Sequence, residues 1–546
     1  MSDTENSSKY ILAIDHGTQG PKSAIVSTNG DVIDWAYQEV PLLVEKGGGV
    51  EQDPDDWWNA IVKTAKKVIG SGKVSADDIV GVCNSSQWSG TVALDEEGNH
   101  LMNSLIWMDT RGAPYMKKLH KSLIQVSGYS ARKMLKFVRV TGGGPSLSGK
   151  DPLAHIMWIK DKRPDVYDNT FMFLEPQDYI NLKFTGKFAA SYASIQMHFL
   201  VDIRDLDNMK YYNKLMKFAK VNPDKFPTDL RWSTDVLGPV KDEVASELGL
   251  NKGVKLIIGA PDLHAATIGS GAVRDYEGHI YIGTSDWLIC HVPYKKTDIF
   301  HNMASFPAAI KGKYMVTNEQ EIAGGALQFL RDKILYHKDE LLKEEQVPDV
   351  YKILDSIVEK VPAGSNNLIF TPWLIGERAP VDDHTVRGGF YNLSLEMSRE
   401  HLIRAIFEGV AYNVKWLHMY VEKFIQKWKM KANPGMTKKD IVMPELNIIG
   451  GGATSNVWCQ IFADVLNRTI KQVKDPIQAN ARGAAFIASV GLGYLTWDQI
   501  PDLIQYSNIF TPNPENRAVY DKLFNEFVNI YKIMKKTHKR LNELSE

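Results

Sequence analysis

The sequence predicts an α/β protein built from two related domains with a cleft between them, and three observations support this. The chain has 546 residues, several times what one hydrophobic core usually organises. Helical and strand-like hydrophobic patterns alternate along its first half. A strand, a Gly-Thr turn and a second strand open the chain, and this unit recurs about 270 residues later.

The first domain is expected to span residues 10–273, after a polar and flexible segment at residues 1–9. It begins with apolar runs separated by a Gly-rich turn and by Asn29-Gly30, which is typical of three strands joined by tight turns. Its predicted strands and one helix lie at residues 10–14, 23–27, 31–37, 254–258 and 264–270.

The second domain is expected to span residues 274–495. It repeats the strand–turn–strand unit at residues 279–292, and it carries longer helices whose apolar residues recur at spacings of three and four. One such helix follows Ser398, a suitable N-cap, and another runs through Val457 to Leu466. Residues 496–546 are predicted to form a helical extension packed on this domain, with a solvated tail from Lys535.

The composition excludes several classes of protein. There are 64 basic and 65 acidic residues, so no excess of positive charge points to nucleic acid. The three cysteines lie far apart without metal-ligand spacing, which indicates a reducing compartment. No long apolar run and no signal-peptide pattern occurs. We expect a cytoplasmic protein without membrane or nucleic-acid partners, and a homodimer is one arrangement open to it.

The first turn, Asp15–Lys22, has the residues of a phosphate-binding turn. Its glycines allow a ligand to approach the backbone, Thr18 offers a hydroxyl, Asp15 suits Mg²⁺ through water, and Lys22 carries a positive charge. An ordinary hairpin turn is the alternative. The second copy, Gly283-Thr284-Ser285, favours the functional interpretation, because two such turns can hold a nucleotide triphosphate from both sides of a cleft.

Two further segments join a strand to a helix. Ile448–Asn456 contains three successive glycines, which allow a base or phosphate to lie against the backbone, although close packing explains them too. Asp262 follows an apolar strand directly, where a carboxylate can accept a proton from a substrate hydroxyl. Its alternative role is that of a helix N-cap, and its position is compatible with both.

Five separated motifs stand in the order found in the FGGY carbohydrate kinases, and the resemblance covers about residues 10–495. The motifs are Asp15-His-Gly-Thr, Gly283-Thr-Ser, Gly376-Glu-Arg-Ala-Pro with Arg387-Gly388, Arg404-Ala-Ile-Phe-Glu-Gly409 and Gly450-Gly-Gly-Ala-Thr-Ser-Asn456. The resemblance implies two ribonuclease H-like domains of the actin-like ATPase type that close over MgATP and a sugar or polyol.

The resemblance also implies roles for individual residues. Asp262 is expected to be the catalytic base, and Asp15 and Asp262 to hold Mg²⁺ through water. The expected ATP-binding residues are Asp15, Gly17, Thr18, Gln19, Lys22, Gly283, Thr284, Ser285, Gly324, Gln328, Gly451, Gly452, Ala453 and Asn456. The expected substrate-binding residues are Gln87, Trp88, Trp107, Asp109, Arg111 and Asp262.

The substrate residues include departures from the family pattern. Trp88-Ser89 replaces the Met-His of xylulokinases, and Leu263 stands where the family carries Asn or Gln. Losing a polar contact excludes substrates that need it, so an acceptor other than xylulose or glycerol is also compatible with this pocket. Trp88 and Trp107 have an alternative role as core aromatics, and Asp109 with Arg111 as a structural ion pair.

One motif is rejected. Gly144–Lys150 has the spacing of a P-loop, but Asp151 stands where a hydroxyl would bind Mg²⁺, and its carboxylate would repel phosphate. We interpret the segment as a loop near the substrate cleft.

The leading hypothesis is an ATP-dependent kinase for a ketopentose, similar to xylulokinase. Kinases for glycerol, a tetritol or a pentitol are the alternative within the enzyme class. A catalytically silent nucleotide-binding regulatory protein of the same fold is the alternative outside it, because fold alone does not determine activity. The presence of Asp262 favours the enzyme.

Overall fold

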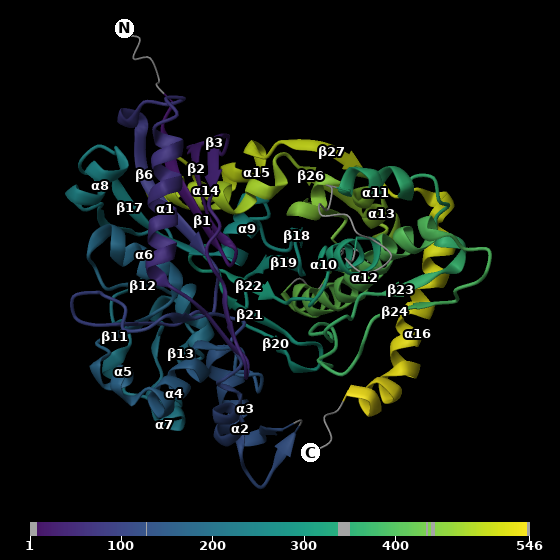
Figure 1. The fold of residues 1–546 in the computed structure, drawn as a ribbon, viewed down its shortest axis with the longest axis horizontal. Coiled ribbons are helices and arrows are strands. Elements are labelled where there is room, and N and C mark those ends of the chain that lie inside the picture. Colours follow the sequence, from purple (N-terminus) through teal and green to yellow (C-terminus); the bar gives the residue numbers. More distant parts are fainter. Residues whose placement is uncertain (1–7, 127, 337–349, 433–434, 438–442, 543–546) are drawn as a thin grey trace.

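The computed structural model describes residues 8–126, 128–336, 350–432, 435–437 and 443–542. Most of the segment expected to be flexible, residues 1–7, lies outside these ranges. Two mixed β-sheets dominate the fold, one in each half of the molecule (Figure 1). Among the described residues, no helix is both long enough and apolar enough to cross a membrane.

The first sheet has the strand order β16-β17-β6-β1-β2-β3. Its strands are β1 (Tyr10–Gly17), β2 (Gly20–Ser27), β3 (Val32–Tyr37), β6 (Ile79–Ser86), β16 (Val236–Pro239) and β17 (Lys255–Pro261). The first three form the predicted antiparallel meander, and β1, β6 and β17 run parallel. The carboxyl ends of these three strands therefore meet at one edge of the sheet.

The second sheet repeats this arrangement in the order β22-β19-β18-β25-β26-β27, with β21 and β20 added beyond β22. Its strands are β18 (Gly278–Ile282), β19 (Asp286–Val292), β20 (Thr297–Asp298), β21 (Met303–Pro307), β22 (Tyr314–Thr317), β25 (Glu445–Ile449), β26 (Thr469–Val473) and β27 (Tyr506–Phe510). Here too the central strands β18, β25 and β26 are parallel. The repeated design predicted from the Gly-Thr turns is confirmed, and with it the α/β fold class.

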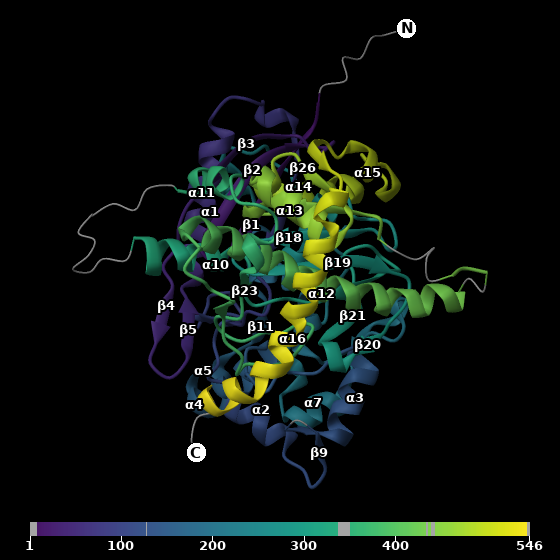
Figure 2. The ribbon, with the colours of Figure 1, turned by 90° about the vertical axis from the view of Figure 1, so that its right-hand side faces the viewer.

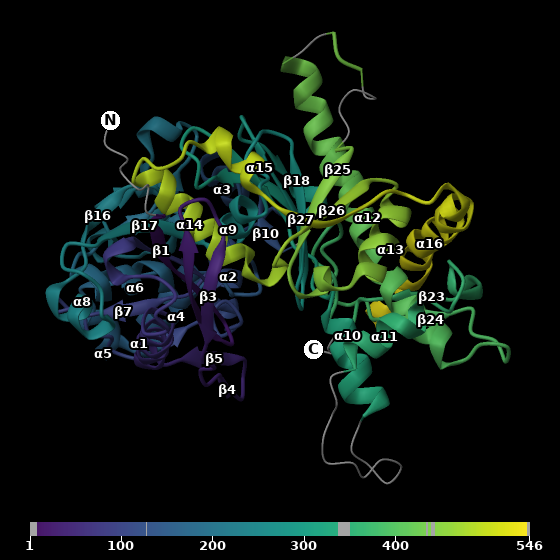
Figure 3. The same cartoon turned by 90° about the horizontal axis from the view of Figure 1, so that it is seen from above.

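Both faces of the first sheet are covered, which explains why β1 is buried on both sides. Leu12 and Ile14 pack in one core cluster with apolar residues of helix α1 (Pro54–Ile69). Ile11 and Ala13 point to the other face, in a cluster with helix α14 (Ala479–Gly491). Helix α14 thus follows the last parallel strand of the second sheet but packs on the first sheet, as Figures 1 and 3 show.

Helix α9 (Asp262–Gly269) crosses α14 at a very close backbone contact. A Cβ atom at Gly269 would lie 1.8 Å from the carbonyl oxygen of Ala479, and one at Gly483 would lie 1.8 Å from that of Ala265. Only residues without a side chain allow this approach. The contact fixes the first residue of α9, Asp262, relative to the loop that precedes α14.

Three helices of the second half lie on the second sheet: two of them contact its strands, and the third packs on those two. They are α12 (Arg399–Ala432), α13 (Asn456–Leu466) and α16 (Arg517–Asn542), the last of which runs along the outside of the molecule (Figure 2). Of the tail expected from Lys535, residues 535–542 are mostly exposed, as predicted, but they continue the helix α16. His538 is buried there and accepts a hydrogen bond from Arg387 N, so a tertiary contact extends the helix.

Candidate active site

Three parallel strands of the first sheet deliver the predicted catalytic residues to one edge. The strand register places Asp15 of β1 opposite Ser85 of β6, and Pro261 of β17 opposite Ser86. Asp262 directly follows Pro261, and Gln87 directly follows Ser86. Residues that are far apart in the sequence are therefore brought together by the topology of the sheet alone.

Asp262 is the first residue of α9 and is partly exposed. Burial, together with the charges of Asp15 and Glu319, raises the pKa of its carboxyl group to about 7. Oδ1 accepts a hydrogen bond from the backbone N–H of Leu263 at 2.8 Å. This bond lowers the pKa of the carboxyl group, but by less than burial raises it. A carboxylate with a pKa near neutrality is well suited to accept a proton from a hydroxyl group.

Asp15 is buried and is held from two sides. Its Oδ2 accepts from Lys22 Nζ at 2.9 Å, and its Oδ1 accepts from Asn480 Nδ2 at 3.1 Å. Lys22 also reaches the carbonyl oxygen of Ile477 at 3.4 Å. The predicted phosphate turn is thus tied to the loop before α14. Asn480 was missed in the sequence, because no local pattern links it to a carboxylate 465 residues away.

Thr18 and Gln19 form the tip of the β1–β2 hairpin, between the paired residues Gly17 and Gly20. The Thr18 hydroxyl donates to Gln87 Oε1 at 3.2 Å and accepts from Trp107 Nε1 at 2.9 Å. Gln19 is exposed, and its carbonyl oxygen anchors the turn to β3 and the segment after it. The predicted phosphate turn and two of the predicted substrate residues therefore form one hydrogen-bonded group.

A second residue missed in the sequence completes this group. Gln52 is fully buried, donates to the Thr18 carbonyl oxygen at 2.7 Å and accepts from Gln87 Nε2 at 2.9 Å. It lies just before α1 in a segment with no chemical motif, so only the packed structure reveals it. Because its amide holds Gln87 and the turn together, Gln52 fixes the orientation of the Gln87 side chain.

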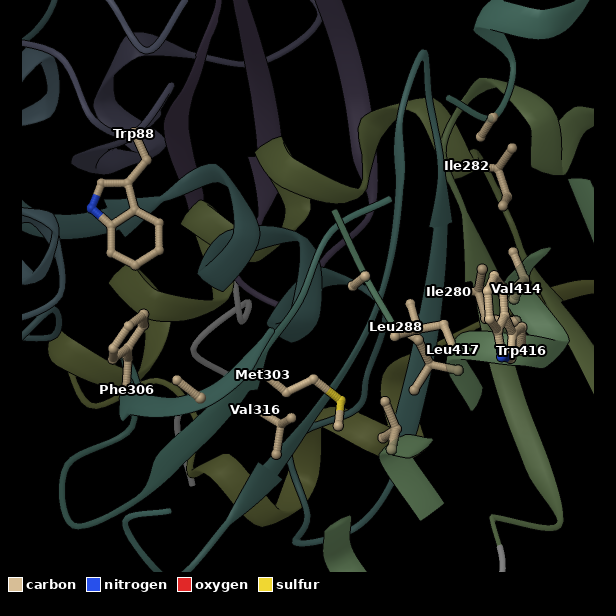
Figure 4. Packing of buried hydrophobic residues seen from close by; sticks show 14 of the residues in the cluster. Trp88, Ile280, Ile282, Leu288, Met303, Phe306, Val316, Val414, Trp416 and Leu417 are labelled. Carbon is tan, nitrogen blue, oxygen red and sulfur yellow. The ribbon is translucent and has the colours of Figure 1, made fainter. Parts of the chain in front are cut away.

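Trp88 lies between the two halves of the molecule. Its ring meets His264 of α9 edge-on at 5.1 Å and Phe306 of β21 at 6.5 Å, and Figure 4 shows Trp88 pointing toward Phe306. Its Nε1 donates to the Ser194 carbonyl oxygen at 2.7 Å, and only 9% of the residue is exposed. Trp88 thus packs against α9 two residues after Asp262, and its contact with a substrate stays a prediction.

Asp109 and Arg111 bind each other. Asp109 is fully buried, and its Oδ2 accepts from Arg111 Nε at 2.9 Å and from Val50 N at 3.0 Å. The Arg111 guanidinium also pairs with Glu51 at 2.6 Å and lies over the ring of Trp158 at 4.1 Å. This geometry is that of a structural ion pair, and the contact of these two residues with a sugar stays a prediction.

The second Gly-Thr turn lies at the matching edge of the second sheet. Gly283, Thr284 and Ser285 connect β18 to β19, and the Thr284 carbonyl oxygen accepts from Ala323 N at 2.8 Å. Gly324 N donates to the Gly283 carbonyl oxygen at 2.8 Å. A Cβ atom at Gly324 would lie 2.5 Å from that oxygen, so the close approach of the two loops requires glycine.

The motif Gly376–Pro380 supports the loop that carries Gly324. The buried Glu377 accepts from Glu321 N at 3.1 Å and from Asn413 Nδ2 at 2.6 Å, and Arg378 pairs with Glu319 and with Glu321. Burial raises the pKa of Glu377 to about 7. Gln328, in helix α10 (Gly325–Phe329), is exposed on the same segment.

The three glycines after β25 lie beside the Gly-Thr turn. Cβ atoms at Gly450 and Gly452 would meet Ile282, at 2.5 Å and 2.3 Å, whereas one at Gly451 would have no atom within 4 Å. Ala453 is buried, and Asn456 begins α13 with its Oδ1 accepting from Gln472 at 3.0 Å. Gly451 thus leaves open space against which a planar group can lie.

Comparison with known proteins gives a consistent result. The family model described as "FGGY family of carbohydrate kinases, N-terminal domain" matches residues 10–269, and the corresponding C-terminal domain model matches residues 278–492. Among curated relatives, xylulose kinase of Bacillus subtilis is 27% identical over 96% of this chain and 97% of its own. Gluconokinase of the same organism is 24% identical, and the match covers 97% of both chains.

Solved structures show the same fold. Gluconate kinase from Lactobacillus acidophilus superposes with a TM-score of 0.81 at 24% identity, covering 98% of this chain and 100% of that one. Glycerol kinase from Plasmodium falciparum with ADP has a TM-score of 0.75 at 18% identity, covering 96% of this chain and 98% of that one.

Proposed function

Because this chain belongs to the FGGY family of carbohydrate kinases, we propose that it transfers the γ-phosphoryl group of ATP to a hydroxyl group of a ketopentose. The observation that carries the proposal is the position of Asp262. It stands at the edge of the sheet where Asp15 and Gln87 also lie, two residues before the His264 that packs on Trp88, and its pKa is about 7. The chain is a carbohydrate kinase, and the xylulose kinases among its relatives favour the ketopentose.

Asp262 accepts the proton of the substrate hydroxyl while the oxygen of that hydroxyl attacks the γ-phosphorus. ADP leaves with the electrons of the broken P–O bond. Thr18 and Lys22 lie at the turn where the β- and γ-phosphates are expected. The Gly283–Ser285 turn and Gly451 approach the nucleotide from the second sheet. Most of the rate enhancement comes from positioning and charge neutralisation, as in other phosphoryl transfers.

The residues present fit a bound Mg²⁺. The charge of Asp15 raises the pKa of Asp262, so the two carboxyl groups interact and a cation between them would relieve their repulsion. Because Asp15 Oδ2 is occupied by Lys22, contact through water suits this pair better than direct ligation. The ion would neutralise charge on the phosphate oxygens.

Three buried cysteines without disulfide bonds support our proposal of a cytoplasmic location.

The first experiment measures ADP release from MgATP with D-xylulose, glycerol, erythritol and xylitol as acceptors. We expect transfer to D-xylulose and a loss of at least about a hundredfold in kcat for Asp262→Asn, since general bases contribute at least this much. The control is Asp242→Asn, in an exposed carboxylate paired with Lys252. Full activity of Asp262→Asn would contradict the mechanism, and ATP binding without transfer to any acceptor would favour a regulatory protein.

A further inference from the structure

Strand β17 contains a β-bulge just before Asp262. Its register against β6 shifts there, so that Ile258 and Gly259 together lie opposite a single residue, Asn84. Gly259 has a φ of 77°, and a Cβ atom at this position would lie 2.0 Å from the Asn84 carbonyl oxygen. Only glycine allows the two strands to approach so closely in this conformation. The bulge is therefore built into the strand that leads to the proposed base.

The bulge determines where Asp262 stands relative to β6. In a regular parallel ladder, every residue of β17 after Ile257 would lie one position farther along β6. Asp262 would then stand about 3.3 Å farther beyond the edge of the sheet, since a strand rises by about this distance per residue. The strand side chains after the bulge would also point to the opposite face. The bulge thus keeps Asp262 at the edge where Asp15 and Gln87 lie.

Two buried amides of one helix bind the backbone of the bulge. The carbonyl oxygen of Ile258 accepts from Gln177 Nε2 at 2.8 Å and from Asn181 Nδ2 at 2.9 Å. Both side chains come from helix α6 (Pro176–Thr185), where their spacing puts them on one face, and each residue is only 1% exposed. A carbonyl oxygen has two lone pairs, so the two amides satisfy this one fully.

The residue opposite the bulge is bound to the same helix. Asn84 Nδ2 donates to Asn181 Oδ1 at 2.5 Å, and both side chains are buried. Asn181 therefore connects the two strands across the bulge. The other end of α9 is fixed by the close contact of Gly269 with α14. The amides of α6 and this glycine contact thus fix the two ends of the helix that begins with Asp262.

We propose that Gln177 and Asn181 are positioning residues for the catalytic base, and that they place Asp262 by maintaining the bulge at Ile258. The proposal rests on the proposed function, in which Asp262 accepts the proton of the substrate hydroxyl. Both amides act through the backbone of residues 258–261, which joins the Ile258 carbonyl group to α9. A displacement of about 1 Å at a reacting group is enough to lower a rate by up to about a hundredfold.

The test removes one amide at a time, in Gln177→Met and Asn181→Leu. Each change keeps the approximate size of the side chain and leaves the other amide on the carbonyl oxygen. The matched control is Gln196→Met, because Gln196 is also 1% exposed and its Nε2 donates to the Thr141 carbonyl oxygen at 2.9 Å. Melting temperatures, kcat and both KM values are measured with whichever of D-xylulose, glycerol, erythritol and xylitol the wild type phosphorylates fastest.

We expect kcat to fall about tenfold in Gln177→Met and in Asn181→Leu, with KM for MgATP and for the acceptor within about twofold of the wild type. Gln196→Met should lose a similar amount of melting temperature but keep its kcat within about twofold. In the Asp262→Asn background, Gln177→Met should lower kcat by less than about twofold, because the group through which the amide acts is already removed.

Four results would overturn the proposal while the proposed function stands. The first is a kcat in both variants no lower than in Gln196→Met. The second is a full tenfold loss on adding Gln177→Met to Asp262→Asn, which would show a general structural effect. The third is a failure of both variants to fold, which would assign the amides to stability alone.

The fourth is a rise in KM for the acceptor at an unchanged kcat. This would assign α6 to the acceptor loop instead, since Glu175, the N-cap residue of α6, accepts from Gly90 N at 2.9 Å. A wild type that transfers phosphate to no acceptor, or a fully active Asp262→Asn, would instead refute the proposed function and this assignment with it.

Discussion

The buried carboxyl group of Asp151 provides a direct test of the electrostatics beside the cleft. Only 5% of the residue is exposed, and its Oδ2 accepts from Ser146 N. Burial is the largest influence and raises the pKa from 3.8 to about 7, although the Ser146 bond and the charges of Arg378 and Lys150 oppose it. Asp151→Asn keeps an oxygen for the Ser146 bond and removes the ionisation.

The sign of the effect follows from linkage. Because the pKa in the folded state lies above that of the unfolded chain, the contribution of Asp151 to stability is complete below about pH 4 and is lost as the pH rises through 7. The difference of about 3 between the two pKa values is equivalent to at most about 4 kcal/mol. We expect Asp151→Asn to exceed the wild type by about 1–3 kcal/mol at pH 8, since partial relaxation of the site reduces the full effect.

The assay is denaturant unfolding of the ligand-free protein at pH 4.5 and pH 8, followed by tryptophan fluorescence. With these two pKa values, the difference between the variant and wild-type midpoints should be about a quarter as large at the lower pH as at the higher one. Asp202→Asn is the control, because the Arg204 side chain lowers the pKa of Asp202 and the expected pH trend has the opposite sign. A shift of equal size at both pH values, or a less stable variant at pH 8, would refute the reasoning.

Two further predictions concern the nucleotide side of the cleft. In Gly451→Val, the added Cβ atom has no protein atom within 4 Å, so the melting temperature should stay unchanged. The side chain would occupy the space expected for the nucleotide, and KM for ATP should rise about tenfold. An unchanged KM would place the nucleotide elsewhere. Asn480→Ala removes the hydrogen bond to Asp15 Oδ1. Because hydrogen bonds to charged groups contribute about 1.5–3 kcal/mol, we expect kcat to fall about tenfold while KM for the sugar is unaffected. Steady-state kinetics at saturating sugar would detect this, and a kcat within twofold of the wild type would contradict it.

Much of the fold and the outline of the site could be predicted from the sequence. Hydrophobic periodicity and turn residues depend on neighbours along the chain, so β1, β2, β18 and the helix after Ser398 were predicted near their observed bounds. Asp262 was identified for the same reason: a carboxylate directly after an apolar strand is a local signal, and the parallel topology then carries it to the sheet edge.

The tertiary structure alone decided which groups meet. The Asn480 contact with Asp15 and the packing of α14 on the first sheet join residues from opposite ends of the chain, and no local pattern encodes such pairs. The same holds for Gln177 and Asn181, which bind the Ile258 carbonyl oxygen from positions 81 and 77 residues away in the sequence. Local sequence determines elements because their hydrogen bonds are short-range, whereas the chemistry of a cleft depends on side chains that only packing brings together.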